Sequence, residues 1–300
     1  MTTTTRSRSS LSRYYDVNGW LFVAPAVTLI ATFMLYPIIR SLVLSFYSGR
    51  GMMLKFSGSG NLTRLWNDPV FWTALQNTVI FFIVQVPIMI TMALILAAML
   101  NNPKLRYSGL FRTMIFLPCV SSLVAYSILF KSMFSLDGVV NNVLLAVGII
   151  GEPIGWLTDP FWAKVLIIIA ITWRWTGYNM IFYLAALQNI DRSIYEAAKI
   201  DGVPSWGRFA FLTIPMLKPV ILFTTITSTI GTLQLFDEVY NLTEGKGGPA
   251  DATLTLSLYI YNLTFRYMPS FGYAATVSYV IVLMVAVLSF LQFYAARERT

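Results

Sequence analysis

The sequence predicts an all-α membrane protein with six transmembrane helices. Hydrophobic residues make up 57% of the 300-residue chain, only 11% of the residues are charged, and the mean hydropathy is positive. A soluble domain carries about 25% charged residues, because water has to solvate its surface. Most of the surface of this chain must therefore face lipid.

Six apolar segments are long enough to cross roughly 30 Å of hydrocarbon as helices. Prolines inside three of them are compatible with spanning helices, because neighbouring helices can satisfy the freed carbonyl groups. A further apolar stretch, Val139–Ile150, is too short to span and predicts an interfacial or external helix. The six predicted spans are Trp20–Ile39, Val79–Leu100, Thr113–Phe130, Val165–Leu187, Val220–Phe236 and Ala274–Tyr294.

Lysine and arginine residues set the predicted orientation, because they are enriched in the cytosolic loops of membrane proteins. With the N-terminus inside, twelve of them fall on the cytosolic side and eight on the external side, and both termini are cytosolic. The glycine-rich turns at Ser57–Gly60 and Gly245–Pro249 are then external. The positive charge follows the membrane topology and is not gathered on one soluble face, so it does not indicate nucleic-acid binding.

The chain is predicted to consist of a cytosolic tail (residues 1–19), a six-helix transmembrane domain (20–296) and a short cytosolic end (297–300). The leader Met1–Arg13 is rich in threonine, serine and arginine and lacks acidic residues, which predicts disorder. Cys119 is the only cysteine, so no intrachain disulfide can form, and histidine is absent. The missing histidine removes the commonest metal ligand and general base and weakens any hydrolytic-enzyme interpretation.

The loop between the fourth and fifth predicted spans, residues 188–219, is the most informative part of the chain. Ile194–Ile200 favours a short helix, Gly202 suits a left-handed C-cap, and a proline two residues later stops the helix. A second short helix is expected to begin with Ser205 as its N-cap and to end before Pro215. Two helices meeting at a fixed elbow would form a rigid projection, and loops of this length in compact proteins are usually functional.

The spacing within this loop resembles the signature loop of permease subunits of binding-protein-dependent ABC importers. The chain reads Glu196-Ala197-Ala198, three residues, Gly202, nine residues, and then Leu212-Thr213-Ile214-Pro215. Leu212 and Ile214 stand where the family more often has isoleucine and leucine. Further segments are similar to permeases for oligosaccharides and glycerol phosphate, so that the resemblance covers nearly the whole chain. These segments include Leu117-Pro118, Trp173–Gly177, Gly247–Pro249, Thr255–Tyr261 and Phe271–Ala275.

The resemblance implies a type I ABC importer permease fold whose coupling-helix loop docks on a separate ATPase. Closure of the ATPase dimer, which binds ATP and Mg²⁺, would open the central site toward a substrate-loaded binding protein. This chain has no Gly-x-x-x-x-Gly-Lys-Ser/Thr phosphate loop, so no cofactor is expected on it. The implied partners are the ATPase dimer, a second permease subunit in a heterodimer, the binding protein and the lipid of a bacterial inner membrane. The coupling residues implied are Glu196, Ala197, Ala198, Asp201, Gly202 and Pro215.

Polar and aromatic side chains in the last three spans suggest a path for substrate. Arg174 is the one charged residue deep within a predicted span, and an intramembrane charge indicates function because lipid burial is costly. Pairing of Arg174 with Asp237 is one option. Aromatic faces with amide or carboxylate edges suit a sugar, although helix packing and interfacial belts explain the same residues. The candidates are Trp173, Arg174, Trp175, Tyr178, Asn179, Gln234, Phe236, Asp237 and Tyr279.

Three functions compete for this sequence. An ABC importer permease for an oligosaccharide or glycoside is favoured, with a non-sugar solute such as glycerol phosphate as the alternative cargo. A proton-coupled secondary transporter would need carboxylate or histidine relays inside the spans, and none is expected there. A membrane-embedded enzyme would need a clustered acid, base or metal site, which a chain without histidine does not offer.

Overall fold

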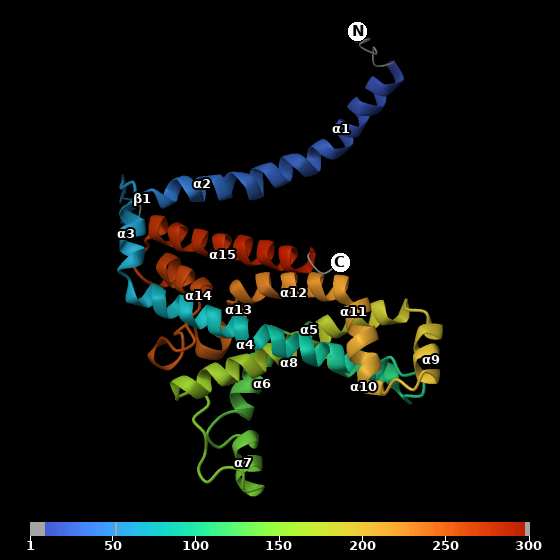
Figure 1. Ribbon diagram of the computed structural model, residues 1–300. Helices are drawn as coiled ribbons and strands as arrows, with labels where there is room; N and C mark the ends of the chain where they lie inside the picture. The colour runs from blue at the N-terminus through green and yellow to red at the C-terminus, as the bar shows by residue number, and fades with distance from the viewer. Residues whose placement is uncertain (1–9, 52, 298–300) are drawn as a thin grey trace.

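A computed structural model of the chain describes residues 10–51 and 53–297, and nearly all of its regular structure is helical (Figure 1). Long helices run side by side and carry short helices at both of their ends. The helices and strands are α1 (Ser10–Ile30), η1 (Ala31–Leu35), α2 (Tyr36–Ser45), β1 (Tyr47–Arg50), β2 (Met53–Phe56), α3 (Gly60–Trp66), α4 (Pro69–Leu100), α5 (Ser108–Val120), α6 (Leu123–Met133), α7 (Val139–Ala146), α8 (Pro160–Gln188), α9 (Arg192–Ile200), α10 (Ser205–Arg208), η2 (Phe209–Thr213), α11 (Ile214–Met216), α12 (Lys218–Leu233), α13 (Asp237–Thr243), η3 (Pro249–Asp251), α14 (Leu256–Tyr261), η4 (Asn262–Arg266) and α15 (Phe271–Arg297).

Four helices of the described chain are long and apolar enough to cross a membrane unbroken, and two bent pairs complete the set. The unbroken ones are Val17–Ser45, Pro69–Leu100, Pro160–Gln188 and Phe271–Arg297. If each bent pair counts as one span, the total is six, as predicted. The short stretch predicted not to span, Val139–Ile150, contains only the eight-residue helix α7.

Two of the long helices begin earlier than predicted, because an Asp-Pro pair starts each of them. The Asp68 carboxylate accepts hydrogen bonds from the backbone N–H groups of Val70 and Phe71, at 3.0 and 3.4 Å. Asp159 caps α8 in the same way, and each helix has proline as its first residue. An aspartate cap followed by proline satisfies or removes the N–H groups that a helix start leaves unpaired.

The third predicted span, Thr113–Phe130, is wrong as a single helix. The chain bends by 100° between α5 and α6. Ser121 and Ser122, between the two helices, have extended ψ angles of 146° and 132°. Pro118 lies just before this break, and a proline within a helix prevents one backbone hydrogen bond and crowds the preceding turn.

The fifth predicted span, Val220–Phe236, also differs from the structure. Its helix, α12, ends at Leu233, and α13 begins only at Asp237. The intervening backbone is held from outside, because the Thr255 hydroxyl donates a 2.7 Å hydrogen bond to the carbonyl oxygen of Leu235. At its other end α12 follows a bend of 71° from the segment Ser205–Met216.

The N-terminal helix stands apart from the body of the protein. In Figure 1, α1 diverges from α15 toward the N-terminus, whereas α2 runs alongside α15. None of the residues 17–45 is buried. Disorder was predicted for Met1–Arg13. Its last four residues, from Ser10, are the first residues of α1, and its first nine residues lie outside the described part. The hairpin β1–β2 follows α2 and was not predicted.

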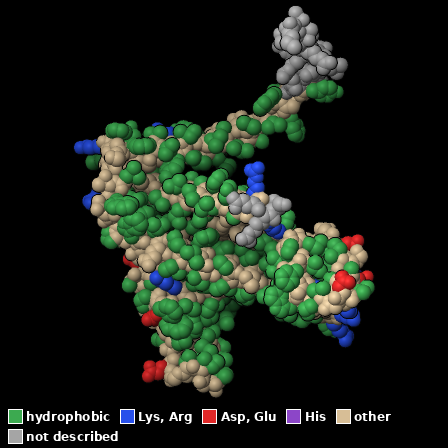
Figure 2. Space-filling view, in the orientation of Figure 1, with side chains coloured by type: hydrophobic (Ala, Val, Ile, Leu, Met, Phe, Trp, Pro, Cys, Tyr) green, Lys and Arg blue, Asp and Glu red, His purple; other side chains and the backbone are tan. Residues whose placement is uncertain are grey.

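Burial and surface fit a protein surrounded by lipid. One buried cluster joins α4, α6, α8, α13, α14 and α15, and a second joins α4 and α8 near the loop that carries α9. Hydrophobic side chains cover most of the visible outer face of the helices, and charged ones gather at the ends (Figure 2). Apolar side chains facing outward are favourable in hydrocarbon, so this surface agrees with the composition.

A hydrogen-bonded cluster ties the end of the bundle opposite α9 together. The Asp68 carboxylate accepts hydrogen bonds from the hydroxyl groups of Tyr259 and Tyr273, both at 2.5 Å. The guanidinium carbon of Arg64 lies 3.9 Å from the centroid of the Tyr273 ring. Residues of α3, α14 and α15 thus meet at the start of α4. Burial raises the pKa of Asp68, but these hydrogen bonds outweigh it and leave that pKa lowered.

Candidate functional site

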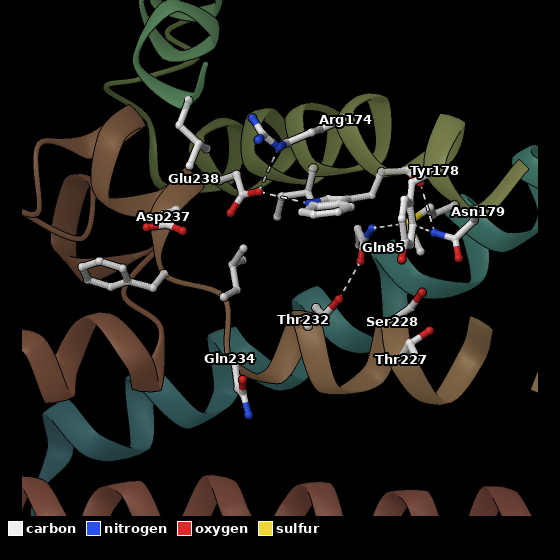
Figure 3. Close-up of a pocket in the computed structure, with 17 residues that line it drawn as sticks. Gln85, Arg174, Tyr178, Asn179, Thr227, Ser228, Thr232, Gln234, Asp237 and Glu238 are labelled. Atoms are coloured by element: carbon white, nitrogen blue, oxygen red, sulfur yellow. Dashed lines mark hydrogen bonds and ion pairs between the residues drawn. The ribbon is translucent and has the colours of Figure 1, made fainter. Parts of the chain in front are cut away.

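A cavity of about 530 Å³ lies where α4 and α8 meet the break between α12 and α13 (Figure 3). We name it the central cavity. Its size falls within the roughly 300–1,000 Å³ of small-molecule sites. It is lined by Gln85, Met89, Leu123, Ile171, Arg174, Trp175, Tyr178, Asn179, Thr227, Ser228, Gly231, Thr232, Gln234, Leu235, Phe236, Asp237 and Glu238.

An ion pair lies on the wall of this cavity. The Nε atom of Arg174 is 3.7 Å from Oε1 of Glu238, and the two side chains are only 8% and 7% exposed. The same carboxylate oxygen accepts a 3.0 Å hydrogen bond from Nε1 of Trp175. The partner of Arg174 is therefore Glu238 and not Asp237, because the turn that starts α13 directs Glu238 to α8. A paired arginine costs far less to bury than an isolated one.

Part of the hydrogen-bonding capacity at the cavity is unused. Arg174 Nε and Nη1 and the side-chain oxygen of Asn179 are buried without a hydrogen-bond partner. The amide nitrogen of Asn179 donates to the backbone oxygen of Trp175 at 3.0 Å, so only its oxygen remains. Buried polar atoms are normally paired, and unpaired ones beside a cavity indicate a ligand or water.

Amides and hydroxyls from three helices surround these groups. The Thr232 hydroxyl donates a 3.0 Å hydrogen bond to the Gln85 side-chain oxygen, which links α12 to α4. Trp175 and Tyr178 form an edge-to-face pair with centroids 5.8 Å apart. Aromatic faces together with hydrogen-bonding edges can hold the apolar and hydroxylated faces of a sugar ring. No group of three metal-ligating side chains occurs among residues 10–51 and 53–297.

The structure brings seven of the nine predicted path residues to the central cavity. These are Arg174, Trp175, Tyr178, Asn179, Gln234, Phe236 and Asp237. Trp173 lies elsewhere, stacked on Tyr126 with ring centroids 5.8 Å apart. Tyr279 also lies elsewhere, and its hydroxyl donates to the carbonyl oxygen of Ile38 at 2.6 Å.

Glu238 and Gln85 line the cavity but were not predicted from the sequence. Both carried a signal: Gln85 is an amide in the middle of the second predicted span, and Glu238 is a carboxylate next to Asp237. Glu238 was assigned to the external loop because the predicted fifth span ended at Phe236. It also corrects the expectation that no carboxylate lies inside the bundle, although paired with Arg174 it is not a free proton carrier.

The first short helix of the 188–219 loop ends at Ile200 as predicted but begins at Arg192, two residues earlier than predicted. Asp191 caps α9 by accepting a 2.9 Å hydrogen bond from the N–H group of Ser193. Gly202 has φ +73°, which confirms the left-handed C-cap. The N–H groups of Gly202 and Val203 donate to the carbonyls of Lys199 and Ala198, at 3.2 and 2.9 Å. This pair of bonds fixes the elbow after α9.

The second short helix differs from the prediction in both ends. Ser205 is its first residue, not its N-cap, and the helical path continues through α10, η2 and α11 past Pro215 to Met216. The wider turn η2 lies directly before α11, where proline occupies one of the first positions. A proline is tolerated at this position, because the N–H group that it lacks is not needed for a hydrogen bond in this turn. The hydroxyls of Tyr195 and Thr213 lie 3.1 Å apart and tie α9 to η2.

The predicted coupling residues are on the surface of this projection, with one exception. Glu196, Ala197, Asp201, Gly202 and Pro215 are exposed, whereas Ala198 is buried and packs within the chain. Large apolar side chains beside them are also exposed: Ile200 is 87%, Trp206 70% and Phe211 76% exposed. An exposed apolar patch rimmed by polar residues is typical of a protein-binding surface.

Known proteins are similar to this chain over most of its length. Residues 78–300 match the family described as the inner membrane component of binding-protein-dependent transport systems. The lactose transport system permease protein LacF of Rhizobium radiobacter is 93% identical over 98% of this chain and 99% of its own length. The arabinooligosaccharides transport system permease protein AraP of Halalkalibacterium halodurans is 32% identical over 97% of this chain and 92% of its own.

A solved structure has the same fold. A chain of a bacterial ABC transporter that imports the acidic polysaccharide alginate superposes with a TM-score of 0.82, over 97% of this chain and 100% of that chain. The two sequences are 23% identical, so this likeness speaks for the fold alone. The predicted type I ABC importer permease fold is confirmed.

Proposed function

Because this chain belongs to the family of inner membrane components of binding-protein-dependent transport systems, we propose that its central cavity is the path by which a sugar crosses the membrane. The chain is a multi-pass permease component of an ABC importer for sugar. Membership in this family removes the secondary transporter and the membrane enzyme as alternatives. The cargo we propose is a disaccharide of the lactose type, since the relative named for lactose transport is 93% identical.

The observation that carries the proposal is the lining of the cavity. Aromatic rings of Trp175 and Tyr178 lie near buried atoms of Asn179 and Arg174 that have no hydrogen-bond partner. A sugar in the cavity would pair those groups through its hydroxyls and cover the rings with its C–H faces. Glycerol phosphate, the alternative cargo, has no ring for the aromatic faces.

Uptake of radiolabelled lactose by cells that express this chain with its partner subunits tests the proposal. We expect lactose uptake that depends on the chain, and none of glycerol 3-phosphate. Accumulation of glycerol 3-phosphate without lactose would refute the sugar assignment.

The projection formed by α9, α10 and α11 is proposed as the contact with a separate ATPase. Its exposed residues Ile200, Trp206 and Phe211 give it an apolar tip, and the hydrogen-bonded elbow after α9 makes it rigid enough to transmit force. ATP and Mg²⁺ would bind to that ATPase, whose dimer would alternate the access of the cavity. Binding of the purified ATPase to the chain, and its loss when Trp206 and Phe211 are changed to serine, tests this contact.

The remaining partners and the orientation follow from the same proposal. A second permease subunit would complete a heterodimer, and a substrate-binding protein would deliver the sugar from outside the bacterial inner membrane. Figure 1 shows both described ends of the chain on the side where α9 and α10 lie, and β1 and α3 on the other. Contact of α9 with a cytosolic ATPase would therefore make both termini cytoplasmic.

A further inference from the structure

Three side chains of acidic or basic residues line the central cavity: Arg174, Glu238 and Asp237. The first two lie 3.7 Å apart and are buried, so their charges compensate each other. Asp237 is exposed, lies beside Glu238 at the edge of the cavity (Figure 3), and forms no ion pair in the described part of the chain. With the three groups ionised, the cavity carries one net negative charge.

We propose that Asp237 determines the charge specificity of the central cavity, which accepts uncharged glycosides and rejects anionic ones. This inference rests on the proposed function, since it concerns the sugar path. It also separates the two candidate cargoes, because glycerol phosphate is an anion and a neutral disaccharide is not.

The hydrogen-bonding groups of the cavity favour hydroxyls over anionic groups. The Asn179 side-chain oxygen and the carboxylates of Asp237 and Glu238 can only accept hydrogen bonds, and Arg174 can only donate them. A sugar hydroxyl can donate to the first set and accept from Arg174. A carboxylate or phosphate group can only accept, so it leaves the acceptors of the cavity unpaired.

Arg174 does not reverse this preference. It is the only cationic side chain lining the cavity, and Glu238 lies within ion-pair distance of its Nε atom. An anion that approached Arg174 would meet two carboxylates for one guanidinium group. Placing like charges together without compensation is strongly unfavourable, which corresponds to at least a tenfold loss of affinity.

The fold by itself does not set the charge of the cargo. The structure with a TM-score of 0.82 belongs to an importer of an acidic polysaccharide. Within the permease, it is the side chains of the path that can distinguish neutral from acidic sugars. Among the acidic and basic residues that line the cavity, Asp237 is the one that is both exposed and without an ion-pair partner in the described part of the chain.

Equilibrium binding to the assembled transporter tests the proposal. The chain, its partner permease and its ATPase are placed in lipid nanodiscs without the binding protein, so that the selectivity of the binding protein does not contribute. The probes are radiolabelled lactose and lactobionate, the carboxylate obtained by oxidising lactose. We expect wild type to bind lactose at least about tenfold more tightly than lactobionate.

Asp237→Asn should raise the affinity for lactobionate about tenfold and lower that for lactose by no more than about tenfold, the value of one hydrogen bond. Asp237→Glu keeps the negative charge and should keep the wild-type preference, and a melting temperature of Asp237→Asn close to wild type shows that this variant folds. Asp137→Asn removes an exposed carboxylate outside the cavity and should change neither affinity.

An unchanged ratio of the two affinities in Asp237→Asn would overturn the inference, as would equal binding of both probes by wild type. Either result leaves the sugar path standing as long as lactose binds. Failure of wild type to bind lactose would instead refute the proposed function.

Discussion

The buried ion pair allows a quantitative prediction about stability. At a separation of 3.7 Å and an effective dielectric constant of ~20, the attraction between Arg174 and Glu238 is about 4–5 kcal/mol. Glu238→Gln keeps an acceptor for Trp175 but leaves the arginine uncompensated. Breaking a buried pair on one side costs about 3–5 kcal/mol. We therefore expect Glu238→Gln to melt of order 5–10 °C below wild type.

A double variant separates charge from packing in this prediction. Arg174→Met removes the charge that Glu238→Gln leaves unpaired, so the double variant should melt above Glu238→Gln alone. The assay is thermal unfolding of the purified transporter, followed by the loss of monodisperse protein. Asp237→Asn is the matched control, because that carboxylate has no ion pair, and its melting temperature should stay close to wild type. The reasoning is refuted if the double variant is no more stable than Glu238→Gln.

Four further predictions address coupling, the path, topology and acid stability. Gly202→Val forces a β-branched residue into φ +73°, which costs about 1–2 kcal/mol, and should abolish transport at normal membrane abundance; wild-type uptake would contradict the coupling role. Asn179→Ala and Gln234→Ala should each lower lactose uptake roughly tenfold with little change in melting temperature. If uptake and melting temperature fell together, the two amides would serve helix packing and not substrate binding. A cysteine at Gly58, where an added Cβ atom has no other atom within 4 Å, should react with an impermeant reagent from outside in a Cys119→Ser background; labelling only from the cytosol would overturn the topology. Because the pKa of Asp68 is lowered from 3.8, its carboxylate stabilises the native state at neutral pH and loses this effect as pH falls through the lowered pKa; Asp68→Asn should therefore flatten the pH dependence of melting below about pH 4, and an unchanged acid profile would contradict it.

Local chemistry explains which parts of the fold were predictable. Gly202 was predicted correctly because a left-handed C-cap is a property of a few adjacent residues. The starts of α4 and α8 were just as readable, because Asp68-Pro69 and Asp159-Pro160 are cap signals, but hydropathy alone placed both starts too late.

The break between α12 and α13 was not predictable in the same way. Apart from threonines, Ser228 and Gln234, the sequence stays apolar from Val220 to Phe236, and the carbonyl freed at Leu235 is satisfied by Thr255 from a distant loop. A helix can end inside a membrane only when another segment pairs its backbone, and no local pattern shows that segment. Because the helix breaks here, Glu238 lies on the wall of the cavity and not in the predicted external loop.

The first helix bears on how the chain reaches its final state. None of the residues 17–45 is buried, so lipid rather than protein packing stabilises this helix. No water in the hydrocarbon can bond to the backbone, and the backbone therefore keeps its hydrogen bonds within the helix. Insertion into the bilayer and packing of helices are separate steps for membrane proteins. The α1 end of this segment can insert into the bilayer, but it packs little against other helices of its own chain. Its sequence is therefore constrained by membrane thickness and by neighbouring molecules, more than by the remainder of the polypeptide.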